Sequence, residues 1–195
     1  MTRNEGLKSS HPALGGTIAQ TLANPELDHF TEDDYEFLKF HGVYQQDDRD
    51  KRKAGRQWIF MVRTKFPGGV LGAKQYAACD DLASRYGNNT LRITTRQDFQ
   101  FHGIIKSGLR QTIKGLNDAL VTTIAACGDV ERNVMAPPTP ATSSLVDHVL
   151  EQARELSNAL NPATRAYHKI WIEGQELNLN DNTNKDFVDP LYGRV

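Results

Sequence analysis

The chain has 195 residues, of which 38% are hydrophobic, and its 23 basic and 24 acidic residues leave a formal net charge of −1. This balance excludes binding to nucleic acid or to an anionic membrane through overall charge, so any anion site must be local. No apolar run reaches the roughly 20 residues that a membrane helix needs, and the polar start lacks the pattern of a secretory signal. We therefore expect a cytoplasmic protein.

Residues 1–56 are expected to form a polar N-terminal arm that wraps a neighbouring part of the protein. Within it, a short apolar patch between Tyr35 and Phe40 is followed by a charged run from Gln45 to Lys53. Charge runs of this kind are typical of a solvated loop. We therefore predict a loop at residues 45–53.

Residues 57–136 are predicted to fold as a half-domain that begins with a buried strand and a helix. The run WIFMVRT (58–64) is rich in β-branched and aromatic residues, and the turn residues Pro67-Gly68-Gly69 close it. A helix is predicted at 71–86, where Cys79 lies on an apolar stripe with helical spacing. Cys79 is therefore expected to pack in the core rather than to react.

A hairpin, a second helix and a last strand complete this half-domain. The stretches LRITT (91–95) and FQFHGI (99–104) alternate apolar and polar residues across a tight connection, as two half-buried strands do. A helix with Ser107 as its N-cap and a short strand at Val130–Met135 follow. The order strand, helix, strand, strand, helix, strand predicts the ferredoxin-like split βαβ arrangement, an α+β fold. Both helices then cover one face of an antiparallel sheet, and the other face is open.

Residues 141–195 are expected to begin a second α+β domain without completing it. The proline-rich stretch 136–140 reads as a linker before it. Ser144 is placed to cap a helix, because Asp147 follows it three residues later. A strand is predicted at HKIWIEG (168–174), and the polar stretch after it reads as loop.

The alternation of the predicted strands gathers a polar set on the open face. Residues i and i+2 of a strand point the same way, so placing Phe60, Leu91 and Phe101 under the helices turns their neighbours outward. The outward set is Arg63, Lys65, Arg92, Arg96, Gln100 and His102, with Arg132 from the last strand. Arginines gathered in this way repel one another unless an anion lies among them, and guanidinium suits carboxylates and sulfur oxyanions. The alternative is an ordinary solvated sheet face.

Other chemistries leave weaker signals. The glycines of Pro67-Gly68-Gly69 lie between a strand and a helix, where backbone amides can approach an anion. The six histidines show no metal-ligand spacing, and the two cysteines, Cys79 and Cys127, are too few for a four-cysteine iron–sulfur cluster. A catalytic triad pattern, a P-loop and a dinucleotide fingerprint are all missing. We predict no metal ligand and no nucleophile in this chain.

Four stretches on and around the open face resemble the sirohaem-containing nitrite and sulfite reductase family, and in particular its assimilatory sulfite reductase branch. They are FHGVYQQDDRD (40–50), FMVRTKFPGGV (60–70), LRITTRQDFQFHGI (91–104) and AACGDVERNVMAPP (125–138). Shorter matches extend the resemblance over nearly the whole chain, at LGGTIA (14–19), Ala166-Tyr167 and DFVDPLYG (186–193).

This resemblance implies that the open face cradles sirohaem, a macrocycle with many carboxylates, next to bound sulfite. Arg63 and Arg132 would be the catalytic residues in contact with sulfite. The cofactor-binding set would be Arg92, Arg96, Gln100, His102, Lys65 and Asn133. The family reaction is the six-electron reduction of sulfite to sulfide, with sirohaem joined to a [4Fe–4S] cluster as the electron relay. Positive charge would stabilise the anionic substrate and the charge that builds up as electrons arrive.

The resemblance stops before the residues that hold the redox centres. Where the family continues past Leu191-Tyr192-Gly193 into a lysine-containing segment, this chain reads Arg194-Val195. The cluster cysteines of the family lie further on, and Cys127 matches none of them. We therefore expect a fragment that is inactive alone. Its partners would be the C-terminal half of the same enzyme and an electron donor, either a flavoprotein reductase subunit or ferredoxin.

Three alternatives stay open. A sirohaem nitrite reductase would share the fold and the cofactor, although the PGG, FQFHG and ERNV stretches resemble the sulfite branch. A non-catalytic anion- or RNA-binding module would use the same open face. Such modules stack bases on sheet-face aromatics, however, and Phe99 and Phe101 are predicted to face the helices. The third alternative is a regulatory or unstable remnant without catalytic activity.

Overall fold

The computed structural model describes residues 3–11, 14–49, 51–127, 131–139, 143–161, 170–172 and 175–177. The chain divides into two units, Met1–Ala163 and Thr164–Val195. The second unit contributes an antiparallel hairpin of β5 (Ile170–Ile172) and β6 (Gln175–Leu177), which agrees with the strand predicted at 168–174. The loop predicted after it lies outside the described residues. All sites discussed below belong to the first unit.

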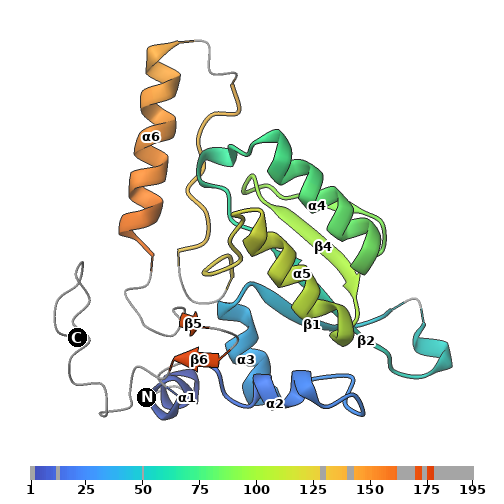
Figure 1. Ribbon diagram of the computed structural model, residues 1–195. Coiled ribbons are helices and arrows are strands. Elements are labelled where there is room, and N and C mark those ends of the chain that lie inside the picture. The colour runs from blue at the N-terminus through green and yellow to red at the C-terminus, as the bar shows by residue number, and fades with distance from the viewer. Residues whose placement is uncertain are drawn as a thin grey trace. The chain divides into compact units, whose positions relative to one another are not determined.

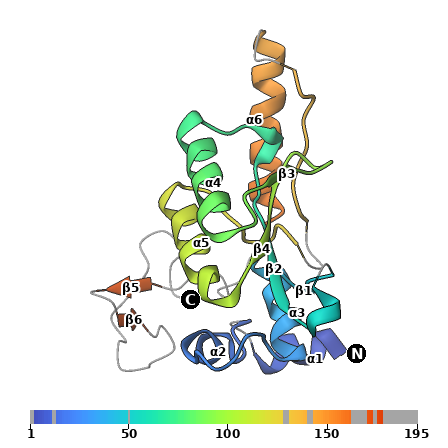
Figure 2. The same cartoon turned by 90° about the vertical axis from the view of Figure 1, so that its right-hand side faces the viewer.

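A four-stranded antiparallel sheet forms the centre of the first unit. Its strands lie in the order β1 (Val43–Asp47), β2 (Trp58–Arg63), β4 (Phe99–Ile104) and β3 (Leu91–Ile93). Two helices, α4 (Ala73–Tyr86) and α5 (Lys106–Asp118), pack on each other and on the same side of this sheet (Figures 1 and 2). The predicted α+β architecture, with both helices on one face, is therefore confirmed.

The edge of the sheet beside β2 is formed by β1, and not by the strand predicted at Val130–Met135. Residues 131–139 include no strand, and their prolines, Pro137 and Pro138, have no N–H to donate to a ladder. β1 overlaps the start of the run predicted as a loop at 45–53, and the short 3-10 helix η1 (Arg52–Ala54) follows it. An edge strand can form from so polar a run because one side of it stays solvated, while Val43 supplies the buried anchor.

The core lies between the sheet and the two helices. Its fully buried members include Phe60, Val62, Phe101, Ile104 and Leu116. Cys79 joins this core as predicted, and burial raises the pKa of its thiol to about 12, which keeps the thiol protonated and unreactive. Ile93 has the same strand alternation as Leu91, which predicts it under the helices, but the structure does not place it there. It is 72% exposed, because β3 is a three-residue edge strand along which burial falls away.

Two helix starts differ from their predictions, by two residues and by one. The N-cap of α5 is Ile105, two residues before the predicted N-cap Ser107, and the helix begins at Lys106. The helix α6 (Ser144–Ala159) is capped by Ser143, whose hydroxyl accepts a hydrogen bond from the backbone N–H of Val146. Within the described ranges, no helix is long and apolar enough to cross a membrane.

The N-terminal region contains three helices: α1 (Arg3–Ser10), α2 (Ile18–Ala23) and α3 (Glu32–Phe40). The buried carboxylate of Asp34 on α3 accepts hydrogen bonds from the backbone N–H and the hydroxyl of Thr17, at 2.8 and 2.6 Å. Gly16 is required beside it, because its φ is +46° and a Cβ there would lie 2.2 Å from Oδ1 of Asp34. The LGGTIA stretch therefore docks the start of α2 onto α3.

Lys106 joins these N-terminal helices to the half-domain. Its side chain is buried, and Nζ donates hydrogen bonds to the backbone carbonyls of Thr21, at 2.9 Å, and Asn24 at the end of α2. We expect Lys106→Met to lower the free energy of unfolding by about 3 kcal/mol, because two buried carbonyls lose a charged donor. Urea denaturation measures this change.

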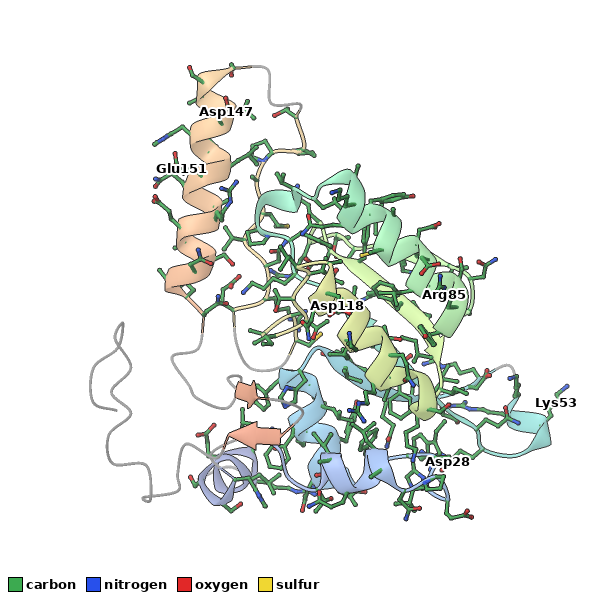
Figure 3. The ribbon with its side chains drawn as sticks, in the orientation of Figure 1. Asp28, Lys53, Arg85, Asp118, Asp147 and Glu151 are labelled. Carbon is green, nitrogen blue, oxygen red and sulfur yellow. The ribbon has the colours of Figure 1, made fainter. Side chains whose placement is uncertain are left out.

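The matched control for that variant is Lys114→Met on the same helix. The side chain of Lys114 is 72% exposed and pairs with Asp118, which Figure 3 shows on α5. Removing an exposed pair of this kind should change the free energy of unfolding by less than about 0.5 kcal/mol. Equal losses in the two variants would contradict the linking role of Lys106.

Candidate functional site

Three polar side chains form a row across the side of the sheet that α4 and α5 leave uncovered. The register pairs Arg63 of β2 with Gln100 of β4, and Gln100 with Arg92 of β3. Paired residues on neighbouring antiparallel strands project to the same side, so the three side chains lie next to one another. Their sequence neighbours Phe99 and Phe101 are buried on the helix side. The structure thus brings together three of the seven residues of the predicted polar set.

Gln100 lies at the centre of this row and holds Arg63. With its carboxamide oxygen turned toward Arg63, that oxygen accepts hydrogen bonds from Nε at 3.1 Å and from Nη2 at 2.6 Å. In this orientation the carboxamide nitrogen of Gln100 lies 3.3 Å from Nε2 of His102 and donates a hydrogen bond to it. Burial first, and then the charges of Arg92 and Arg63, lower the pKa of His102. A neutral imidazole near pH 7 suits this accepting role.

Tyr44 and Cys127 form a contact beside Arg63. The ring of Tyr44, on β1, has its centre 5.9 Å from Cζ of Arg63. Burial first, and then a hydrogen bond with the Cys127 thiol, raise the pKa of Tyr44 to about 12. Burial also raises the pKa of the Cys127 thiol. Both groups are therefore neutral near pH 7, and they add no negative charge to this side of the sheet.

Arg132 lies close to the same contact, although its segment is not a strand. Its charge acts on both Tyr44 and Cys127, as the charge of Arg63 does, so the two arginines approach one pair of side chains from different segments. The backbone around Arg132 is irregular, and its side chain is half-buried. We use the name arginine face for the row with its neighbours, namely Arg63, Arg92, Arg96, Gln100, His102 and Arg132.

Side-chain hydrogen bonds hold the segment that carries Arg132. Nδ2 of Asn133 donates to the backbone carbonyls of Phe66 and Arg96, each at 2.8 Å. The carboxamide of Gln97 donates to the carbonyl of Ala136 at 2.6 Å and accepts from its N–H at 3.1 Å. Asn133 was predicted to bind the cofactor, and the structure places it as a buried tether. Sequence reasoning did not find Gln97, because a side chain that replaces a strand ladder leaves no periodic signal.

Lys65 lies in a different environment from the exposed one predicted for it. The residue is 4% exposed, and its Nζ donates to Oε2 of Glu131 at 3.0 Å and to Oδ1 of Asn161 at 2.9 Å. Its charge is therefore compensated inside the protein. The pair with Glu131 adds another tether at the start of the segment that carries Arg132.

Within the described part of the chain, the arginines of the arginine face pair with no carboxylate. Among the residues that the structure describes, no ion pair involves Arg63, Arg92, Arg96 or Arg132. Other arginines of the same chain are paired, as Arg52 is with Asp47 at 2.7 Å and Arg85 with Asp81 at 2.8 Å. Guanidinium groups gathered on one side of a sheet without carboxylates form a site that favours an anion.

The glycine turn predicted as a second anion contact does not offer free amides. In η2 (Pro67–Gly69), the N–H of Gly68 donates to the carbonyl of Val134 and that of Gly69 to Phe66, each at 2.8 Å. Both glycines have φ near +70°, and the space where a Cβ would lie is closed by Leu150 at Gly68 and by Gln97 at Gly69. The turn serves packing, so the weak signal for an anion contact at its amides is not supported and the turn is an ordinary one.

Two further features bear on chemistry elsewhere in the molecule. Within the described part of the chain, no three His, Cys, Asp or Glu side chains are grouped to hold a metal ion.

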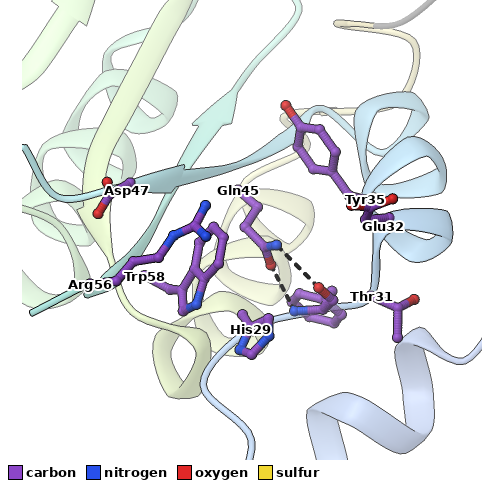
Figure 4. A pocket seen from close by; sticks show the side chains of 9 residues that line it. His29, Thr31, Glu32, Tyr35, Gln45, Asp47, Arg56 and Trp58 are labelled. Atoms are coloured by element: carbon purple, nitrogen blue, oxygen red, sulfur yellow. Dashed lines mark hydrogen bonds between the residues drawn. The ribbon is translucent and has the colours of Figure 1, made fainter.

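A pocket of about 450 Å³ lies beside Trp58, outside the arginine face (Figure 4). Arg56 covers the indole of Trp58 at 4.0 Å, His29 stacks on it at 5.0 Å, and Gln45 bonds both backbone groups of Phe30. The aromatic and amide side chains that line this pocket therefore already have partners within the protein.

Comparisons with known proteins place this geometry in a family. Residues 53–119 match the nitrite/sulfite reductase ferredoxin-like half domain, which spans β2, α4, β3, β4 and α5. The fold is also similar to that of the NirA protein of Mycobacterium tuberculosis, with a TM-score of 0.61 and 23% sequence identity. That likeness covers 73% of this chain and 28% of NirA. Residues 53–119 therefore belong to the nitrite/sulfite reductase ferredoxin-like half-domain family.

Curated relatives narrow the branch of this family. The sulfite reductase [NADPH] hemoprotein beta-component of Shouchella clausii is 48% identical over 97% of this chain and 34% of that protein. The proteins of the same name from Staphylococcus epidermidis and Methylobacterium are 45% and 40% identical, over 98% and 100% of this chain. The chain is thus homologous to the N-terminal portion of these beta-components, and it spans about a third of their length.

Proposed function

We propose that this chain is the N-terminal part of a sulfite reductase haemoprotein, a cytoplasmic enzyme of sulfur assimilation that reduces sulfite to sulfide with six electrons. Its arginine face would hold sirohaem and sulfite. The homology over nearly the whole chain supports this proposal, since the relatives are named as NADPH-linked hemoprotein beta-components. Those names favour a flavoprotein subunit over ferredoxin as the electron donor.

The observation that carries the proposal is the set of arginines without carboxylate partners. Sirohaem is a flat macrocycle with many carboxylates, and its carboxylates suit the planar forks of guanidinium groups. Arg92 on β3 and Arg96 in the turn before β4, which form no ion pair among the described residues, fit such a group. Ligands for the haem iron and for a [4Fe–4S] cluster would have to come from residues outside the described part of this chain.

The catalytic roles then divide between two arginines and the groups around them. Arg63 and Arg132 would bind the sulfite anion and stabilise the charge that builds up on it, in a place where Tyr44 and Cys127 stay neutral. The two hydrogen bonds to Gln100 orient the fork of Arg63 before any ligand arrives. Sirohaem, when bound, would supply the iron and the conjugated path by which electrons reach sulfite. The arginines would also orient water for proton delivery.

The other predicted residues fall into two groups in this proposal. Arg92 and Arg96 would bind the carboxylates of sirohaem, with Gln100 and His102 between them and Arg63. Lys65 and Asn133 would act through the segment that they tether, by holding Arg132 in place. They are positioning residues in this account, because their polar atoms are committed to the protein.

The rival functions have less support. An RNA-recognition role needs exposed aromatic rings on the sheet, whereas Phe99 and Phe101 are 6% and 0% exposed. Nitrite reduction would use the same arginine face, and the family match covers nitrite reductases as well. The names of the relatives favour sulfite.

The chain itself permits a binding test with uroporphyrin, a soluble tetrapyrrole that carries eight carboxylates. We expect the double variant Arg92→Ala/Arg96→Ala to bind this probe about a hundredfold more weakly than the unmodified chain, roughly tenfold for each charge-assisted contact. Absorbance titration measures the affinity. The matched control is Arg85→Ala/Arg110→Ala, which removes two exposed arginines from α4 and α5. Equal affinities of the two double variants would contradict the proposal.

A further inference from the structure

Asp98 is a buried carboxyl group at the edge of the arginine face. The register that pairs Arg63 with Gln100 continues through the hydrogen bond from Thr64 N to Phe99 O at 3.0 Å, which puts Asp98 opposite Lys65. The residue is 1% exposed, and its Oδ1 accepts a hydrogen bond from the N–H of Phe66 at 3.0 Å. In the sequence, Asp98 lies in the tight connection between the two strands of the hairpin, where no pattern marks it.

Two buried oxygen atoms at this place have no hydrogen-bond donor. They are Oδ2 of Asp98 and Oδ1 of Asn133, which are unpartnered within the described residues. The two side chains are anchored to the same residue, because Asp98 accepts from the N–H of Phe66 and Asn133 donates to its carbonyl. Burying one acceptor without a donor is costly, and burying two beside one residue is costlier still. A single hydrogen between them would remove both costs.

The charged and titratable groups around Asp98 come from every neighbouring segment. They are Arg63 at the end of β2, Lys65 beyond it, Arg96 in the turn before β4, and Cys127 after α5. Glu131 bonds Lys65, and Arg132 follows it in the chain. Burial raises the pKa of Asp98 to about 7, and it outweighs the Phe66 N–H and the charges of Arg63, Lys65 and Arg96, which act in the opposite direction. Among the described residues no cation forms an ion pair with Asp98, and Lys65 and Arg63 are bonded to other groups.

We propose that Asp98 keeps a proton in the folded chain, that its O–H donates a hydrogen bond to the amide oxygen of Asn133, and that the charge of the arginine face is thereby left free for an anion. The donated hydrogen fixes Asn133, whose other two hydrogen bonds hold the segment of Arg132. Loss of the proton would break this link and add a negative charge beside Arg63 and Arg96. Asp98 is therefore a positioning residue. Its effect on the anion rests on the proposed function, whereas the protonation itself does not.

This assignment predicts a particular dependence of stability on pH. The carboxyl has an ordinary pKa of about 4 in the unfolded chain and about 7 in the folded one, so between these values the folded chain holds one more proton. The stabilisation is complete below about pH 4 and is lost as the pH rises through about 7. The equilibrium constant for unfolding should therefore rise by up to about tenfold for each pH unit in that range from this group alone.

The test compares the chain with Asp98→Asn, which keeps an oxygen for the N–H of Phe66 and places an amide donor near Asn133. This variant should lose the tenfold dependence, whereas Asp118→Asn on α5 should keep it. The carboxyl carbon shift of Asp98 in the unmodified chain, followed by NMR, should titrate with a midpoint near 7. A midpoint near the ordinary value of about 4 would overturn the proposal. The NMR midpoint of the unmodified chain tests the protonation of Asp98 even when Asp98→Asn does not fold.

A second measurement tests the link to the arginine face, with inorganic sulfate as the probe because its charge is constant between about pH 5 and 9. The affinity of the unmodified chain for sulfate should fall by about tenfold as the pH rises past 7, and that of Asp98→Asn should stay constant. A constant affinity in both chains would overturn the link. Failure of both chains to bind sulfate would instead count against the proposed function, and the NMR midpoint would still test the protonation of Asp98.

Discussion

Replacing Arg132 by alanine in the complete reductase is expected to lower the rate of sulfite reduction by about a hundredfold or more, the usual effect of removing one oxyanion donor. Arg132 has no ion-pair partner within the described residues and lies beside Arg63 at the Tyr44–Cys127 contact. Its loss should therefore change the free energy of unfolding by less than about 0.5 kcal/mol. Turnover with reduced methyl viologen and thermal denaturation measure the two effects.

Two further variants make this result specific. Arg132→Lys keeps the charge but loses the planar fork, so we expect a rate between those of the unmodified enzyme and Arg132→Ala. Arg110→Ala removes an exposed arginine from α5 and should leave the rate unchanged. Parallel loss of stability and turnover in Arg132→Ala would mean that the residue serves the fold, and the account of sulfite binding would be wrong.

A glutamate in place of Gln100 is expected to weaken uroporphyrin binding by about a hundredfold without lowering the stability of the chain. The carboxamide oxygen of Gln100 already accepts two hydrogen bonds from Arg63, at 3.1 and 2.6 Å, so a carboxylate there would form a bidentate ion pair. Arg92 is the paired residue on the other side. The protein would then neutralise the positive charge that the anion needs.

The control for this variant makes the same charge change elsewhere. Gln111→Glu lies on the exposed surface of α5, so it lowers the net charge equally without touching the arginine face. Absorbance titration should show near-normal affinity for this control, and urea denaturation should show that Gln100→Glu is at least as stable as the unmodified chain. Normal binding by Gln100→Glu would mean that the tetrapyrrole does not contact the row.

The row of the arginine face was predictable from the sequence because strand geometry is local. The period of two places Arg63, Gln100 and Arg92 on one side and the phenylalanines on the other, whatever the rest of the chain does. The register then confirmed that these three residues are neighbours. The family was also predictable, because the strand motifs that resemble it are contiguous stretches of the sequence.

The tethers of the site were not predictable, because each joins segments far apart in the sequence. The alternation along the strand predicts an exposed Lys65, whereas hydrogen bonds to Glu131 and Asn161 hold its Nζ inside the protein. Asn133 was predicted on a strand, whereas its hydrogen bonds to two backbone carbonyls replace that strand. Tyr44 was missed because the polar run around it indicated a loop, and its strand forms by pairing with β2.

The central claim is that the arginine face of this half-domain binds the tetrapyrrole of the complete reductase. The most direct test is an experimental structure of that complete protein with sirohaem bound. The account predicts carboxylates of sirohaem within about 3 Å of the guanidinium groups of Arg92 and Arg96, with Arg63 and Arg132 directed at the sulfite site. A tetrapyrrole bound elsewhere, with carboxylates of the protein itself paired to these arginines, would contradict it.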